Sequence, residues 1–270
     1  MALPETNREI YHRNPLAEVT VQLRFPPILR IEAEAPAQFQ EAIRERYPFY
    51  RQAITAGQLP PDLPLPPPIR NLIQGMGTPA GPVQHFFETQ DRKCSVTLSR
   101  ESLALKTMTY ARWEEFRDQL EAVRVTFEQV YRPASYTRIG LRYVDVIRRS
   151  RLGLDGVRWG ELLNPWIGGE LSAPELDEGV DSAQRQVHCK LEGDDCFLWL
   201  RTGFAQAEPP SSGAPKENCF LLDCDFHTHG STETTNVTVI LNTFNRTAGN
   251  LFRWAIRDRL RNALQPQPLE

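Results

Sequence analysis

Acidic and histidine side chains alternate along the segment from Leu222 to His229. Every second side chain of an extended strand points to the same face, so these two aspartates and two histidines are expected to share one face. Carboxylate and imidazole groups are ligands for zinc and other divalent ions. The pattern therefore predicts a candidate metal site at Asp223, Asp225 and His227. The alternative is a strand end whose histidines are simply solvated.

Basic and polar side chains fall on the matching face of several other predicted strands. Arginine makes bidentate contacts with phosphate and aromatic rings stack on bases, so this face could bind a phosphate-bearing ligand or single-stranded nucleic acid. The alternative is a solvated face with cross-strand arginine–aspartate pairs, and the mixed charges favour it. The set consists of Arg24, Arg138, Arg142, Gln186, His188 and Lys190, with Trp199 nearby.

The last predicted helix carries a basic edge beside its apolar stripe. Basic residues in the final turns of a helix complement its dipole, which explains them without a partner. Contact with nucleic acid or with an acidic protein is the alternative. The residues at this basic edge are Arg253, Arg257 and Arg261, accompanied by Arg246 and Arg259.

Motifs for nucleophilic or nucleotide chemistry are missing from the sequence. It contains no GxSxG elbow, no P-loop and no GxGxxG. None of the five cysteines belongs to a CxxC pair, and His188 and Cys189 point to opposite faces of their predicted strand. No catalytic residue and no cofactor is therefore assigned, which leaves enzymatic activity open but disfavoured.

Two long amphipathic helices and a series of short strands are predicted to position these side chains. Alternation over residues 19–25 indicates a half-buried strand. Apolar residues recur every three or four positions over 113–130 and 237–260, which indicates helices that pack on a sheet. Short helices are expected from Pro36 and around residues 159–166, and further strands over 83–89, 94–99, 103–109, 136–148, 183–191, 196–204 and 219–227.

Two proline-containing segments are expected to connect these elements. The run Leu59–Pro68 is too proline-dense for helix or central strand, so it is predicted to be an extended connector, with a ligand motif for another protein as the alternative. The segment Ala207–Asn218 is predicted to be the tip of a hairpin.

The order of elements reads β-α-β-β-β-α twice, over residues 1–134 and 135–270. This predicts an α+β fold of two duplicated halves in one integrated domain, which share a curved antiparallel sheet with both long helices on one face. Helix-grip and TATA-binding-protein-like folds have a similar order, a resemblance of folds that implies no function.

Composition narrows the class of protein. The chain has 270 residues, 40% of them apolar, and a formal charge of −3. That is enough apolar sequence for a large core, and the near-neutral balance argues against an obligate nucleic-acid or membrane binder. The sequence shows no signal peptide and no run of about eighteen apolar residues, so a cytoplasmic protein is expected.

Several short stretches together resemble a family of uncharacterised prokaryotic proteins described as sporadically distributed. They are Asn14–Glu18, Tyr110 with Trp113, Glu114 and Phe116, Arg138–Tyr143 and Leu222–Asp225. Where that family leads us to expect asparagine, this chain has Asp145. The resemblance implies an accessory gene of the kind found in defence or toxin neutralisation, and it supplies no catalytic residues.

These observations lead to two functional hypotheses. The first is a non-enzymatic accessory protein that binds a protein or nucleic acid, rather than a membrane, through its sheet face or basic helix edge. The second is a domain that binds a small anion or nucleotide on the polar sheet face, with metal-assisted hydrolysis as an extension. A homo-oligomer that assembles through exposed sheet edges is a third, weaker option.

Overall fold

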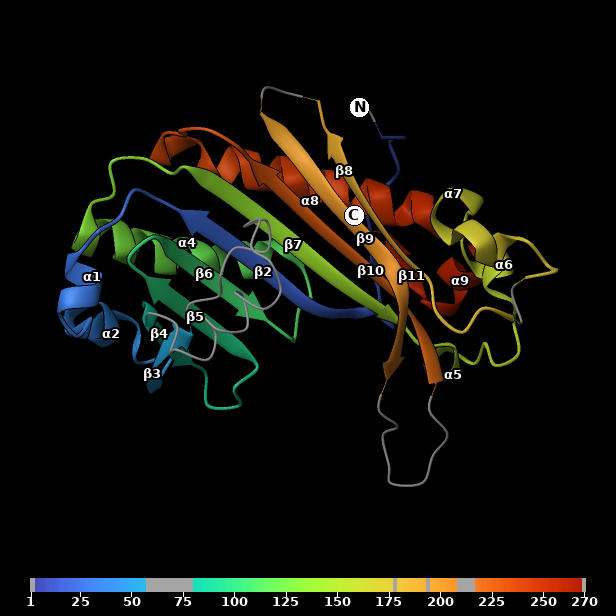
Figure 1. Ribbon diagram of the computed structural model, residues 1–270, viewed down its shortest axis with the longest axis horizontal. Coiled ribbons are helices and arrows are strands. Elements are labelled where there is room, and N and C mark those ends of the chain that lie inside the picture. The colour runs from blue at the N-terminus through green and yellow to red at the C-terminus, as the bar shows by residue number, and fades with distance from the viewer. Residues whose placement is uncertain (1–2, 57–79, 177–178, 193–194, 208–216, 269–270) are drawn as a thin grey trace, which may run out of the picture.

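A large antiparallel sheet forms the centre of the molecule (Figure 1). The computed structural model of the protein describes residues 3–56, 80–176, 179–192, 195–207 and 217–268. Within them, nine strands pair in the order β3-β4-β5-β6-β2-β7-β10-β9-β8. The strands are β2 (Leu16–Arg24), β3 (Phe49–Ala56), β4 (Ala80–Glu88), β5 (Cys94–Ser99), β6 (Ser102–Thr107), β7 (Arg138–Ile147), β8 (Gln184–Lys190), β9 (Cys196–Ala207) and β10 (Glu217–Thr228).

The two middle strands, β2 and β7, show why the sheet has one apolar and one polar face. Val19, Val21 and Leu23 are fully buried, whereas the side chains between them are partly exposed. In β7, Ile139 and Leu141 are buried on the same side. This alternation directs one face of the sheet toward the core.

Two helices of 19 residues cover the apolar face, α4 (Trp113–Tyr131) and α8 (Val237–Ala255) (Figure 1). Their buried side chains recur at three- and four-residue spacing, as in α4, where Phe116, Leu120 and Val123 are buried. Shorter helices are α1 (Arg30–Ala33), α2 (Ala37–Ile43), α5 (Arg149–Leu152), α6 (Trp159–Leu162), α7 (Pro165–Gly168) and α9 (Asp258–Ala263), with 3₁₀ turns η1 (Gly169–Ser172) and η3 (Thr234–Asn236).

The predicted α+β class and the large antiparallel sheet are confirmed. The last helix was expected to be continuous through residue 260, and that expectation is wrong, because the chain is extended at Ile256 before α9 begins. Ile256 forms a β-bridge with Leu163, and the Arg257 amide donates to the Leu162 carbonyl. Tertiary hydrogen bonds therefore replace helical ones at this point.

Three strands were not anticipated from the sequence. β3 extends the sheet beyond β4, and its Phe49 and Tyr50 side chains are exposed, so it lacks the alternation of a half-buried strand. β1 (Glu9–Tyr11) and β11 (Pro266–Pro268) pair the two ends of the chain in a small second sheet. The predicted connector Leu59–Pro68 and residues 208–216 of the predicted hairpin tip lie outside the described residues. No helix in the described part of the chain has the length and apolar character needed to span a membrane.

Candidate ligand-binding cavity

The polar residues predicted to share a face do lie together on the side of the sheet opposite α4 and α8. Strand registers place them in neighbouring rows, for example Arg142 across from Asp225, and His188 across from Trp199. Arg24 lies on β2, Arg138 and Arg142 on β7, the two aspartates on β10, and His188 and Lys190 on the edge strand β8.

Arginines of the polar face are engaged by aspartates on the adjacent strand. Arg142 donates to both oxygens of Asp223 at 2.7 and 2.9 Å, and Arg201 adds a third bond of 3.2 Å. Arg138 donates to both oxygens of Asp225 at 2.9 Å. These contacts are the cross-strand arginine–aspartate pairs that the sequence analysis gave as the alternative to a binding face.

The remaining members of this polar set differ in their surroundings. Arg24 is exposed and donates to Gln22 at 3.3 Å, with no carboxylate of the described chain in ion-pair distance. His188 stacks on Trp199 with ring centroids 4.1 Å apart, and Lys190 is exposed at the same edge of the sheet. Binding of an anion or nucleic acid on this face stays a prediction.

The predicted metal-ligand residues Asp223, Asp225 and His227 also share this face, because they occupy every second position of β10. Both carboxylates already accept hydrogen bonds from arginines. The His227 ring instead lies against two other imidazoles, those of His188 and His229.

The basic edge is divided by the break at Ile256. Arg253 lies on α8 and donates to Asp258 at 2.9 Å, whereas Arg261 lies on α9 and pairs with Glu9. Arg257 precedes α9 and is exposed. The expectation of one continuous helix edge is therefore wrong, and two of its three arginines are neutralised by acids.

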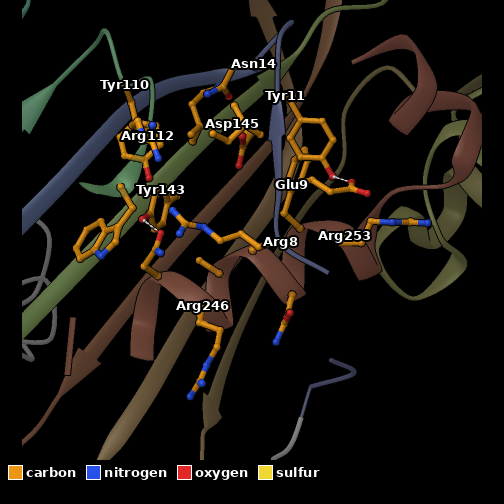
Figure 2. Close-up of a pocket in the computed structure, with 18 of the residues that line it drawn as sticks. Arg8, Glu9, Tyr11, Asn14, Tyr110, Arg112, Tyr143, Asp145, Arg246 and Arg253 are labelled. Carbon is orange, nitrogen blue, oxygen red and sulfur yellow. Dashed lines mark hydrogen bonds between the residues drawn. The ribbon is translucent and has the colours of Figure 1, made fainter. Parts of the chain in front are cut away.

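A cavity of about 500 Å³ lies on the other face of the sheet (Figure 2). Its base is formed by β7 and β10, and its sides by the start of α4 and the middle of α8. The N-terminal segment, residues 6–16, closes the remaining side. Among the residues that line it are Tyr11, Tyr110, Trp113, Tyr143, Asp145 and Arg246.

Asp145 is the most unusual residue of this cavity. Its position on β7 places it in the inward row with Tyr143 and Ile147, and it is only 5% exposed. Figure 2 shows its side chain pointing from the strand into the space between Tyr143 and Tyr11. Among the described residues, the Asp145 carboxyl has no hydrogen-bond or ion-pair partner. Burial raises its pKa to about 8, so at neutral pH the group is largely protonated.

Four other ionisable groups that line the cavity have pKa values shifted away from neutral pH. Burial raises the pKa of Tyr110 to about 12 and holds that of the Tyr143 phenol and the Cys224 thiol well above their usual range. Hydrogen bonds from Arg8 lower the pKa of Glu114 to about 2. Asp145 is therefore the lining group expected to titrate between pH 6 and 9.

Arg8 belongs to the ion pair that holds the N-terminal segment on α4. It donates to both Glu114 oxygens, at 2.6 and 3.1 Å, and Arg112 donates to the same carboxylate at 3.2 Å. Arg8, which Figure 2 shows among the side chains of the cavity, is thus paired with Glu114.

Side-chain amides supply polar groups along α8. The Oδ1 atom of Asn245 accepts from the Tyr143 hydroxyl at 2.9 Å, and that of Asn242 accepts from the Trp113 indole at 2.7 Å. Asn250 accepts from the amide and hydroxyl of Thr6. With their oxygens occupied, the amide groups retain N–H donors for a bound molecule.

The sequence did not predict this cavity, although one signal for it was present. Asp145 is a charged residue in the inward row of a strand whose other inward residues are apolar or aromatic. Such a buried acid is costly unless a partner or a raised pKa compensates for it.

No family model, curated protein or solved structure matches this chain.

Proposed function

We propose that this protein is a binding protein for a small molecule that carries N–H donors at one end and an anionic group at the other. The observation that carries the proposal is the Asp145 carboxyl, which is buried at the base of the cavity and has no hydrogen-bond or ion-pair partner in the part of the chain that the structure describes. A buried acid of this kind lowers stability in the empty protein, and a strongly shifted pKa in a cavity is characteristic of functional sites.

The chemistry of the Asp145 carboxyl defines one end of the ligand. Ligand N–H groups would donate hydrogen bonds to the Asp145 carboxylate, which receives none from the described residues. These bonds would favour the ionised form of the group. The aromatic side chains of Tyr11, Tyr110 and Trp113 provide a lining that suits a planar, partly apolar body.

The other end of the cavity suits an anion. Arg246 lines it from α8, is exposed, and has no ion pair to a carboxylate of the described residues. An exposed guanidinium binds phosphate or carboxylate at low desolvation cost. Nucleotides combine both ends, and a purine nucleotide is small enough for a cavity of about 500 Å³.

The same cavity supports the accessory, non-enzymatic role expected from the sequence resemblance. Of the residues that carry this resemblance, Asn14, Leu16, Tyr110, Trp113, Glu114 and Tyr143 all line it. Macromolecule binding on the polar sheet face has less support, because the strand-centre arginines of that face are paired with aspartates. We therefore keep the hypothesis of nucleotide binding, with the binding site on the face of the sheet that α4 and α8 cover.

The proposed duplication has support in the order of strands. β2 is followed across the sheet by β6, β5 and β4, and β7 by β10, β9 and β8, so that β2 and β7 lie side by side at the centre. Each half also contains one 19-residue helix, which follows its strands of the large sheet. An approximate two-fold between the halves would put the cavity near their common boundary.

The experiment that tests the proposal is calorimetric titration of the full chain with GMP, IMP and guanosine. In guanine, N1–H and the adjacent amino group can donate side by side to one carboxylate, whereas IMP lacks the amino group and guanosine lacks the phosphate. GMP is expected to bind best. Asp145→Asn should weaken GMP binding by about 2 kcal/mol or more, roughly thirtyfold.

Two matched variants act as controls for the two ends of the ligand. Asp155→Asn changes an exposed aspartate and Arg257→Ala an exposed arginine, both outside the cavity lining, and neither should alter the affinity for GMP. Arg246→Ala should weaken GMP but not guanosine. Equal affinity of wild type and Asp145→Asn for GMP, or no binding of any of the three probes, would contradict the proposal.

Proton release offers an independent readout. Because the pKa of Asp145 is raised to about 8, binding at pH 7 that ionises this carboxyl releases most of one proton. The apparent affinity should therefore rise between pH 6 and 8 and level off above. Titration at pH 7 in buffers of different ionisation enthalpy measures the proton directly, and Asp145→Asn should abolish the release.

A further inference from the structure

Three histidines lie close together at the edge of the polar face, and one of them, His188, is distant in sequence from the other two. His188 lies on β8, His227 on β10, and His229 directly follows β10. β9 lies between the two strands, yet the His188 and His227 rings stack with centroids 5.7 Å apart and the His227 and His229 rings meet edge to face at 5.0 Å. One nitrogen from each ring lies within 4.8 Å of the other two.

The central histidine has a defined tautomer. Its Nδ1 lies 3.1 Å from the backbone carbonyl of Asp225, and a carbonyl oxygen can only accept, so Nδ1 carries the hydrogen. The Nε2 lone pair of His227 is therefore available. A backbone carbonyl that orients the non-coordinating nitrogen is the usual support of a metal-binding histidine.

The surroundings of the three rings also suit a bound ion. His227 is 2% exposed, whereas His188 and His229 are exposed and can turn toward it. With metal–nitrogen bonds of about 2.0–2.1 Å, nitrogens in a tetrahedral site are about 3.3 Å apart, so rotation of the two outer rings would close the set. Phe197 packs on both His227 and His229, which limits the access of water.

We propose that His188, His227 and His229 form a three-histidine site for a divalent transition-metal ion, best matched by Zn²⁺. Three imidazoles select zinc and its neighbours over magnesium or calcium, which require oxygen ligands. Three protein ligands leave one tetrahedral position open to water or to an anion. This site is independent of the proposed cavity, because it lies on the opposite face of the sheet and shares no lining residue with it.

The test is titration of the untagged, chelator-treated full chain with Zn²⁺, followed by Co²⁺ as a spectroscopic probe. One ion per chain is expected, and Co²⁺ should give the intense visible absorption of a four-coordinate complex. His188→Ala and His229→Ala change exposed side chains and should retain the fold, yet each should weaken Zn²⁺ binding at least about tenfold. His12→Ala removes an exposed histidine outside the cluster and is the matched control.

A second readout comes from Trp199, whose ring stacks on His188. Cu²⁺ or Co²⁺ at the site should quench its fluorescence in wild type and not in His188→Ala, and Trp199→Phe identifies the signal. The proposal is overturned if His188→Ala and His229→Ala bind Zn²⁺ as tightly as His12→Ala. It is also overturned if Asp225→Asn abolishes binding while His188→Ala does not, because the ion would then be held by the carboxylate set of β10.

Discussion

Two aspartates at neighbouring positions of the sheet have opposite surroundings. Asp145 pairs with Leu222 across β7 and β10, and the next pair in the ladder joins Val144 to Asp223. Both carboxylates are almost fully buried, at 5% and 4% exposure. Asp223 faces the polar side and accepts three hydrogen bonds from two arginines, whereas Asp145 faces the helices and accepts none from the described residues.

In the proposed function, this difference separates a charge that stabilises the fold from a group that binds a ligand. Arginine contacts offset the desolvation of Asp223 within the folded protein, so the polar face is satisfied without a partner molecule. Asp145 instead avoids the cost of a buried charge by remaining protonated. A cavity whose acid has no internal partner is the better place to expect a ligand.

The largest expected effect is the pH dependence that Asp145 imposes on stability. Its folded-state pKa of about 8 lies above the unfolded value of about 3.9, so the folded state holds a proton that the unfolded state releases. The free energy of unfolding should therefore fall between pH 4 and 8, by up to about 5 kcal/mol. Asp145→Asn should remove this fall and stabilise the protein at pH 8, with little effect at pH 4.

Urea unfolding of wild type and Asp145→Asn across this pH range measures the effect. Asp155→Asn changes an exposed carboxyl and should follow the wild-type profile. If the Asp145→Asn profile also followed wild type, the Asp145 carboxyl would be ionised and compensated in the folded protein, and its contrast with Asp223 would disappear.

The next effect comes from removing the partners of Asp223. The double change Arg142→Ala with Arg201→Ala removes three hydrogen bonds and both guanidinium groups from the Asp223 carboxylate. Because the two arginine side chains are themselves partly exposed, the expected cost is about 1–3 kcal/mol, less than for a fully buried pair. Chemical denaturation at pH 7 measures the loss, and Arg24→Ala, on the same face without an ion pair in the described chain, is the control.

An unchanged free energy of unfolding in this double variant would contradict the expectation, because it would show that water, rather than arginine, satisfies the Asp223 carboxylate.

The contrast between the two faces explains how far the sequence could be interpreted. Strand parity placed Arg138, Arg142 and Asp223 together, because side-chain alternation is local and needs only a correct strand. The α+β class followed from the two apolar helix stripes. The same parity places Asp145 in the inward row of β7, but the sequence analysis noted this residue only as a departure from the family pattern and did not assign it to a site.

Features that depend on distant segments could not be predicted in the same way. The cavity exists because residues 6–16, α4 and α8 meet over β7 and β10. The histidine cluster requires the strand order β10-β9-β8, which brings His188 across β9 to His227. The break at Ile256 depends on a bridge to Leu163, which no local pattern of the helix sequence encodes.

The smallest expected effect concerns Arg8, which lines the same cavity and pairs with Glu114. Its pair with Glu114 is partly exposed, so Arg8→Ala should lower the free energy of unfolding by less than about 1 kcal/mol at pH 7. The pKa of Glu114, now about 2, should rise toward its ordinary value. Since this folded-state pKa lies below the unfolded one, the contribution of the pair is present above about pH 4 and lost as the pH falls toward 2.

The same variant tests whether burial alone keeps Asp145 protonated. Because desolvation is the cause of its raised pKa, that value should stay at about 8 when Arg8 is removed. Arg112→Ala removes a second arginine from Glu114 without freeing the N-terminal segment, and it is the matched control. A carbon-13 titration of the Glu114 and Asp145 carboxyls in both variants measures the two pKa values. If the pKa of Asp145 rises in Arg8→Ala, Arg8 already acts on this carboxyl, and the aspartate at the base of the cavity is less free for a ligand than its geometry indicates.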